Sequence, residues 1–280
     1  MLKQIGRLDA DAIYEIENEL KEFFELFENG KKLPAEKKLN EMAKTPNYFV
    51  REYLGKLLVD YKDSDKLLPI INKMIKHRVY GIRATALFFI ANKFHKEPSK
   101  ILDVLDESYD AIPWEAESIV NELWKNYPVI MKERMSSWLE SDDEKKRALA
   151  FHGIENISKN DPLFIMDFVA RVLDDESMEV QKKITHVLSQ VARNRPAECY
   201  PYIREWLSEA NEMRMKTLWV SMKKLVNIVT QKSKREKTQD FVLLTKQTIS
   251  DWKKDDNKNV ADMGHKLFAA INSNQNRKQI

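Results

Sequence analysis

The chain lacks the features that mark several large classes of protein. Cys199 is the only cysteine in 280 residues, which excludes an internal disulfide and a cysteine-rich zinc site and predicts a reducing compartment, so we expect a cytoplasmic protein. Glycine and proline are scarce, at six and nine residues, and no apolar run approaches the roughly 20 residues that span a bilayer. We therefore expect a helical protein with no membrane partner.

The familiar motifs of catalysis are absent as well. The sequence has no glycine-rich phosphate loop, no Gly-x-Ser-x-Gly nucleophile turn and no His-Glu-x-x-His zinc motif. The five histidines stand too far apart in the sequence to pair as metal ligands: His77, His95, His152, His186 and His265. Nucleophilic and metal-assisted catalysis have no support in the sequence, and we expect neither a metal nor an organic cofactor.

The composition is that of a folded chain with a large charged surface, since 43% of residues are hydrophobic and 32% are charged. The formal net charge of +3 hides an uneven distribution. Residues 1–30 carry eight acids and three bases, whereas residues 178–237 carry thirteen bases and six acids. The second region is therefore the candidate for contact with a polyanion.

Similar segments recur along the chain. A segment around Arg51 is followed by a similar one around Arg83, at a spacing of 83 − 51 = 32 residues, and the pattern returns near Arg147, at Glu179–Ile184 and near Arg214. Between these marks, apolar residues recur at i, i+3, i+4 and i+7, as in helices that bury one face. A period of roughly 32 to 35 residues is typical of solenoids built from helical pairs.

We therefore predict an all-α fold, an α-α superhelix (HEAT-like repeat solenoid) of about six to seven helical pairs that forms a single domain over residues 1–280. Residues 1–30 are predicted to form an acidic N-terminal cap helix, Val260–Ile271 the last helix, and residues 272–280 a frayed tail. Seven prolines are expected at or near helix starts or turns: Pro34, Pro46, Pro69, Pro98, Pro128, Pro162 and Pro196.

The most specific pattern lies in the middle of the chain. It consists of Trp114–Ser118 (Trp-Glu-Ala-Glu-Ser), then Trp138–Arg147 with its acidic turn about one repeat later, then Val180–Ile184 (Val-Gln-Lys-Lys-Ile). From about Ile112 to Tyr202, this order resembles the signature of the HEAT-like repeat DNA alkylation repair family, which includes the AlkC/AlkD-like alkylpurine DNA glycosylases.

The resemblance implies a reaction and a set of residues for it. Glycosylases of this family cleave the N-glycosidic bond of cationic alkylated purines, with an aromatic cradle and a carboxylate that stabilise the positive charge on the sugar. On matching positions, Trp114 would be the cradle aromatic and Arg147 a clamp on phosphate or base. Ser118 stands where the family has aspartate, and its hydroxyl carries no charge, so Glu117 is the candidate replacement and Glu122 the alternative. The chain is thus either an active glycosylase or a diverged member.

A series of basic residues falls on predicted second helices or nearby turns of successive repeats. A cationic track of this kind suits the phosphates of a nucleic-acid backbone. The resemblance predicts that the track binds duplex DNA, alkylated or intact. The residues concerned are Lys146, Lys182, Lys183, Arg193, Arg195, Arg214, Lys216, Lys223 and Lys224.

Structural interpretations compete with these functional ones. Trp114 would pack between repeats, Arg147 would form an ion pair with Asp142, Asp143 or Glu179, and the basic residues would form an ordinary solvated face. The alternative for the whole chain is a HEAT-like scaffold that binds a protein partner and no nucleic acid.

Overall fold

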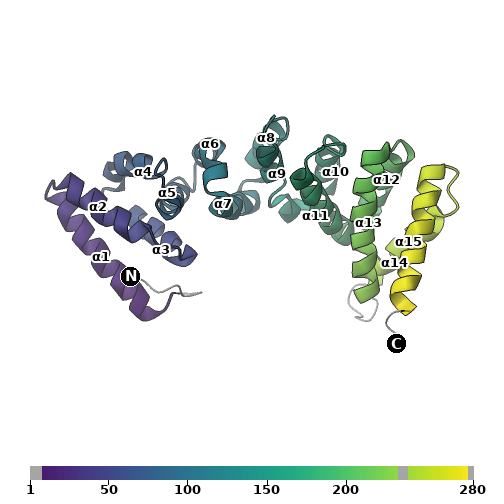
Figure 1. Ribbon diagram of the computed structural model, residues 1–280, viewed down its shortest axis with the longest axis horizontal. Coiled ribbons are helices and arrows are strands. Elements are labelled where there is room, and N and C mark those ends of the chain that lie inside the picture. The colour runs from purple at the N-terminus through teal and green to yellow at the C-terminus, as the bar shows by residue number, and fades with distance from the viewer. Residues whose placement is uncertain (1–7, 233–238, 277–280) are drawn as a thin grey trace. The chain divides into compact units, whose positions relative to one another are not determined.

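The computed structural model describes the backbone of residues 8–232 and 239–276, and every regular element in these ranges is a helix (Figure 1). The predicted all-α helical repeat is confirmed. After α1, the described part contains seven pairs of consecutive helices, within the predicted range. The helices are α1 (Ala10–Glu28), α2 (Lys32–Ala43), α3 (Tyr48–Val59), α4 (Leu68–Met74), α5 (Tyr80–Lys93), α6 (Pro98–Ser108), α7 (Pro113–Asn126), α8 (Pro128–Trp138), α9 (Glu144–Ala150), α10 (Pro162–Ala170), α11 (Met178–Asn194), α12 (Pro196–Ser208), α13 (Glu212–Lys232), α14 (Gln239–Trp252) and α15 (Lys258–Asn276).

Prolines and polar caps fix where many of these helices begin. Five first helices, α4, α6, α8, α10 and α12, carry a proline in their first turn, where the missing amide has no partner within the helix. The second helices α3, α9 and α11 begin instead at capping side chains, Asn47, Asp143 and Ser177, each of which accepts a hydrogen bond from a backbone amide of the first turn. The prediction that prolines mark helix starts is confirmed.

The contacts divide the chain into two compact units, one up to Ile119 and one from Val120 onward. In the second unit, α9 packs against α11, α11 against α13 and α13 against α15, so the second helices of successive pairs form a layer. The first helices pack likewise, α10 against α12 and α12 against α14. The single domain over residues 1–280 stays a prediction.

In the first unit, helix α5 is buried along most of its length. Gly81, Ile82 and every residue from Ala84 to Ile90 are inaccessible to solvent or nearly so. Two glycines permit the close approach of its neighbours. A Cβ on Gly55 of α3 would lie 2.6 Å from the Cβ of Phe88, and one on Gly81 would lie 2.5 Å from the carbonyl oxygen of Ala43.

The two ends of the fold contain the predicted terminal helices. The acidic helix α1 buries Ile16, Leu20 and Phe23 on its apolar side, and residues 1–7 lie outside the described residues. Helix α15 continues past Ile271 to Asn276, because residues 272–276 contain neither glycine nor proline, so a frayed tail over 272–276 is not observed. Residues 277–280 lie outside the described part of the chain.

Cys199 lies in the core of the second unit, on α12. Its thiol is fully buried, and this burial raises its pKa above the ordinary value. Cys199 is therefore a small core residue with little thiolate character.

Candidate nucleic-acid interface

Trp114 lies in the first turn of α7, directly after Pro113, and its side chain is 76% exposed. A tryptophan packed between repeats would be buried, so the structural alternative for this residue is wrong. Exposure on this scale leaves the indole available to an outside partner.

The next residue, Glu115, is completely buried and belongs to the structure rather than to an open site. Its Oε1 accepts hydrogen bonds from Arg51 Nη2 at 2.6 Å and Nε at 3.2 Å, and its Oε2 accepts one from the Tyr80 hydroxyl. Burial, followed by the hydrogen bond to Glu115, raises the pKa of Tyr80 above its ordinary value. The negative charge of Glu115 is thus neutralised inside the first unit.

Ser118 is also engaged. The hydroxyls of Ser118 and Tyr48 lie 3.0 Å apart and share a hydrogen bond, and burial raises the pKa of Tyr48. The position at which the resemblance expects aspartate therefore contacts Tyr48 at the start of α3. Glu117, the candidate replacement, is half-buried on the same helix, and its catalytic role stays a prediction.

Arg147, at the start of α9, anchors the turn that precedes its own helix. Its Nη1 donates to the carbonyl oxygens of Ser141 at 2.8 Å and Asp142 at 3.0 Å. Its Nε and Nη2 donate to the two carboxylate oxygens of Asp175 at 2.7 and 3.1 Å, and this hydrogen bonding raises the pKa of Arg147. The ion pair is formed with Asp175 and not with the predicted carboxylates Asp142, Asp143 or Glu179. Asp175 lies in the turn before α11, and its carboxylate faces the guanidinium of Arg147.

The same anchoring contact occurs in four repeats. Each time, a side chain in the first turn of a second helix donates to the carbonyl oxygen six residues earlier: Arg51 to Thr45, Arg83 to His77, Arg147 to Ser141 and Gln181 to Asp175. The sequence showed the period of these residues but not their role. Trp114 and Arg147 lie in different units, and a joint catalytic role for Trp114, Glu117 and Arg147 stays a prediction.

A groove of about 400 Å³ runs between α11 and α13 in the second unit, and we call it the lysine groove. Two polar contacts join the helices beneath it, Thr217 to Gln181 and Ser221 Oγ to Thr185 Oγ1 at 3.2 Å. It is lined by Glu176, Met178, Gln181, Lys182, Thr185, Met213, Lys216, Thr217, Val220 and Lys224.

Three of the predicted DNA-binding residues, Lys182, Lys216 and Lys224, lie together in the lysine groove. Lys182 forms an ion pair with Glu179 at 2.7 Å, but both side chains are largely exposed and such pairs contribute little. Lys216 and Lys224 form no ion pair with the described residues. The exposed side chains of Met178 and Val220 give the groove an apolar component.

The other predicted DNA-binding residues have partners of their own. Two arginines are tied to the protein: Arg214 pairs with Asp174, with Nη2 2.5 Å from Oδ2, and Arg195 donates twice to the carbonyl oxygen of Lys159. The remaining ones contact aromatic or polar side chains: Lys146 at Trp138, Lys183 at His152, Arg193 at Gln190 and Lys223 at Trp219. Their role in DNA binding stays a prediction.

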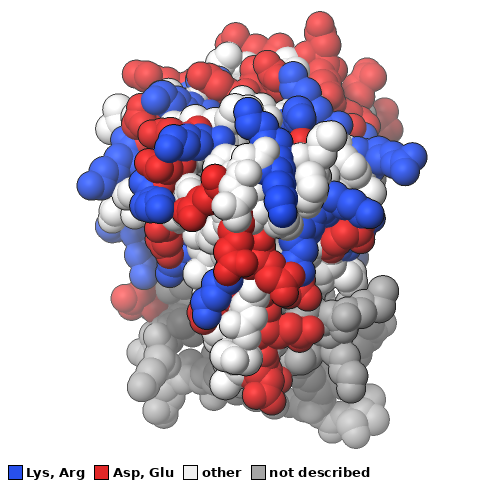
Figure 2. Space-filling view, turned by 90° about the vertical axis from the view of Figure 1, so that its left-hand side faces the viewer, with Lys and Arg blue, Asp and Glu red and all other residues white. Residues whose placement is uncertain are grey.

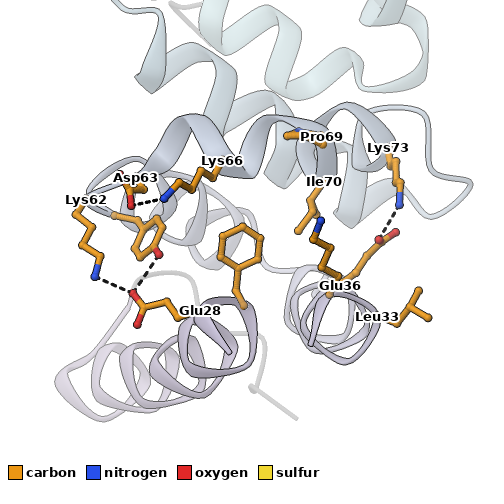
Figure 3. A pocket seen from close by; sticks show the side chains of 12 residues that line it. Glu28, Leu33, Glu36, Lys62, Asp63, Lys66, Pro69, Ile70 and Lys73 are labelled. Carbon is orange, nitrogen blue, oxygen red and sulfur yellow. Dashed lines mark hydrogen bonds and ion pairs between the residues drawn. The ribbon is translucent and has the colours of Figure 1, made fainter. Parts of the chain in front are cut away.

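A wider groove of about 1020 Å³ lies at the N-terminal end of the first unit, between the helices α1, α2 and α4 (Figure 3). Leu33, on its border, is 80% exposed. Three of the four lysines around it form ion pairs of 2.8 to 3.0 Å, namely Lys62–Glu28, Lys66–Asp63 and Lys73–Glu36, and Lys32 adds one further positive charge. Figure 2 shows Lys and Arg interspersed with Asp and Glu on this end of the molecule, which does not favour a polyanion.

Within residues 8–232 and 239–276, no group of three or more His, Cys, Asp or Glu residues could hold a metal ion. No helix of the same ranges is both long and apolar enough to cross a bilayer.

Comparison with known proteins gives one informative match. Residues 39–225 match the family model described as "DNA alkylation repair enzyme". A search of curated proteins found no match.

Among solved structures, one engineered protein is 13% identical, with 85% of this chain and 74% of that chain covered and a TM-score of 0.37. A second engineered protein is 16% identical, with coverages of 86% and 90% and a TM-score of 0.27. A designed armadillo repeat protein is 13% identical, with coverages of 84% and 98% and a TM-score of 0.24. These similarities are too low to support a conclusion about this chain.

Proposed function

The chain belongs to the DNA alkylation repair enzyme family, and from this premise we propose that it binds duplex DNA through the lysine groove. The observation that carries the proposal is the position of Lys182, Lys216 and Lys224 around one groove, on two adjacent helices, with all three lysines within the matched residues.

The spacing of these lysines suits a phosphate backbone. Lys216 and Lys224 are separated by 224 − 216 = 8 residues on α13, which is about 12 Å along a helix, or roughly three to four times the axial rise per phosphate of one DNA strand. Lys182 approaches from α11 on the other side. Flexible lysine side chains act as point charges that follow a backbone without reading its sequence, so the groove supports binding by charge and not by base recognition.

Binding, rather than base release, is the function that the geometry favours. A glycosylase must present negative charge to the sugar, yet the Glu115 carboxylate is paired with Arg51 and the Ser118 hydroxyl with Tyr48. Release of alkylated purines, with Glu117 as the carboxylate, stays a hypothesis that a separate assay tests below.

The experiment measures the affinity for a short fluorescent duplex as a function of salt, for the wild type and for Lys216→Glu/Lys224→Glu. The control is Lys254→Glu/Lys258→Glu, which makes the same change in net charge in the same unit, at exposed positions outside the groove. We expect the groove variant to weaken binding and to lower the slope of log K against log salt by about 2, roughly one per lysine, with a much smaller effect in the control.

The absence of duplex binding by the wild type at low salt would contradict the proposal, as would equal losses in the two variants. The protein scaffold is the second candidate, and the exposed Leu33 beside the wide N-terminal groove, where most charges are paired, is the observation that favours it. A wild type that binds no duplex would leave this candidate in first place.

A further inference from the structure

Arg83 differs from its counterparts in other repeats. Arg51 and Arg147 each present the Nε and Nη2 edge of the guanidinium to a carboxylate, Glu115 and Asp175 respectively. Arg83 meets no carboxylate within residues 8–232 and 239–276. Its Nη1 donates to the carbonyl oxygens of His77 and Arg78, its Nη2 donates to the carbonyl oxygen of Ala111 at 2.9 Å, and its buried Nε has no hydrogen-bond partner.

Comparison between repeats shows which residue stands in place of the missing carboxylate. Asp175 lies 28 residues after Arg147, and Ala111 lies 28 residues after Arg83. Both occupy the turn that precedes the next second helix. Ala111 therefore stands where the other repeat has its acid, and the edge of Arg83 that an oxyanion would take is left with a single carbonyl contact.

Two more cations lie beside Arg83. Lys76 and Arg78, in the turn between α4 and α5, are exposed and line the same open cavity of about 640 Å³ as Arg83. None of the three forms an ion pair with a carboxylate among the described residues. Glu107 is the one acid in the lining, so this cavity has an excess of positive charge.

We propose that Lys76, Arg78 and Arg83 form a binding site for a phosphate group. A phosphate offers paired oxygens to the Nε and Nη2 edge of Arg83, whose one contact is with the Ala111 carbonyl oxygen, and this would match the bidentate contact that Arg147 makes with Asp175. Lys76 and Arg78 add charge from the rim. The site lies in the first unit and the lysine groove in the second, so the proposal does not rest on the function proposed above.

The phosphate could belong to a nucleic-acid backbone or to a small phosphorylated molecule, and one probe addresses the chemistry common to both. Inorganic phosphate is titrated into the full-length protein by calorimetry, with chloride holding the ionic strength constant. Ala111→Asp is the decisive variant, because it places a carboxylate of the protein itself where Arg83 can pair with it. The position is exposed and lies just before α7, where a negative charge also suits the start of a helix.

We expect the wild type to bind phosphate, and both Ala111→Asp and Lys76→Glu/Arg78→Glu to weaken this binding at least about tenfold. Ala111→Asp should keep or raise the melting temperature, which separates loss of the site from loss of the fold. Lys96→Glu is the control, because Lys96 is an exposed lysine of the next turn outside the cavity and should leave phosphate affinity unchanged.

No phosphate binding by the wild type, or unchanged binding by folded Ala111→Asp, would overturn the proposal. A second titration with a short duplex identifies the source. A parallel loss of duplex affinity in Lys76→Glu/Arg78→Glu supports the site with a backbone phosphate as the ligand, and unchanged duplex affinity together with lost phosphate binding supports it with a small phosphorylated molecule.

Discussion

Arg51 and Glu115 lie 64 residues apart in the sequence and form an ion pair that is almost completely buried, with Nη2 2.6 Å from Oε1. The pair joins α3 to α7 across the end of α5, and the Tyr48–Ser118 contact joins the same two helices one turn further along α7. Two residues of the segment Trp114–Ser118, namely Glu115 and Ser118, therefore help to hold the first unit together.

Removal of the Glu115 carboxylate should destabilise the protein. Glu115→Ala leaves the Arg51 guanidinium buried without its counter-ion, and we expect a loss of about 3–5 kcal/mol in the free energy of unfolding. Chemical denaturation followed by circular dichroism measures it. Glu122→Ala, at an exposed position on the same helix, should change that free energy by no more than about 0.5 kcal/mol, and similar values for the two variants would contradict the buried pair.

The Arg147–Asp175 contact should appear as an energetic coupling. In a double-mutant cycle with Arg147→Ala and Asp175→Ala, we expect an interaction free energy of about 1–3 kcal/mol, because the two side chains share two hydrogen bonds. If Arg147 instead holds a phosphate of DNA, Arg147→Ala should lower the affinity for duplex DNA, and the interaction free energy between Arg147 and Asp175 should be near zero.

Asp255 should make the stability of the second unit depend on pH. Its hydrogen bond from Arg204 holds the pKa of the Asp255 carboxyl below the ordinary value. A depressed pKa in the folded state gives stability that is present above the unfolded-state pKa of about 3.9 and is lost as the pH falls through the folded-state pKa. Asp255→Asn should therefore be less stable than the wild type near neutral pH, and this difference should shrink in acid. Urea denaturation over a pH series checks it, and a difference that stays constant would count against the pair.

Trp114→Ala separates binding from folding. Because the side chain is largely exposed, the free energy of unfolding should change by no more than about 0.5 kcal/mol. If the indole stacks on a base, duplex affinity should fall by about 1–3 kcal/mol, as measured by fluorescence anisotropy. Unchanged affinity would remove Trp114 from the interface.

Trp114→Ala also tests, in a second assay, the hypothesis that the protein releases alkylated purines from DNA. A duplex that carries N7-alkylguanine or N3-alkyladenine is incubated with the wild type, Trp114→Ala and Glu117→Gln. Base release by the wild type that both substitutions abolish would support a glycosylase. No release by the wild type would contradict it.

The sequence predicted those features that depend on neighbouring residues. The helices follow from apolar periodicity and from prolines such as Pro162 and Pro196, and the grouping of Lys216 with Lys224 follows from their spacing on one helix. The partners of Arg147 and Glu115 could not be predicted in this way. Which of several nearby acids meets an arginine depends on how repeats stack, and the 64-residue separation of Arg51 and Glu115 exceeds any local pattern.

Buried Cys199 makes the chain convenient for chemical mapping. Because the only native thiol is enclosed in the core and its raised pKa suppresses the thiolate, a cysteine introduced on the surface would be the sole reactive one. A spin label or cross-linker could then be attached at one chosen position in the lysine groove or beside Arg83. Cys199 would not need to be replaced.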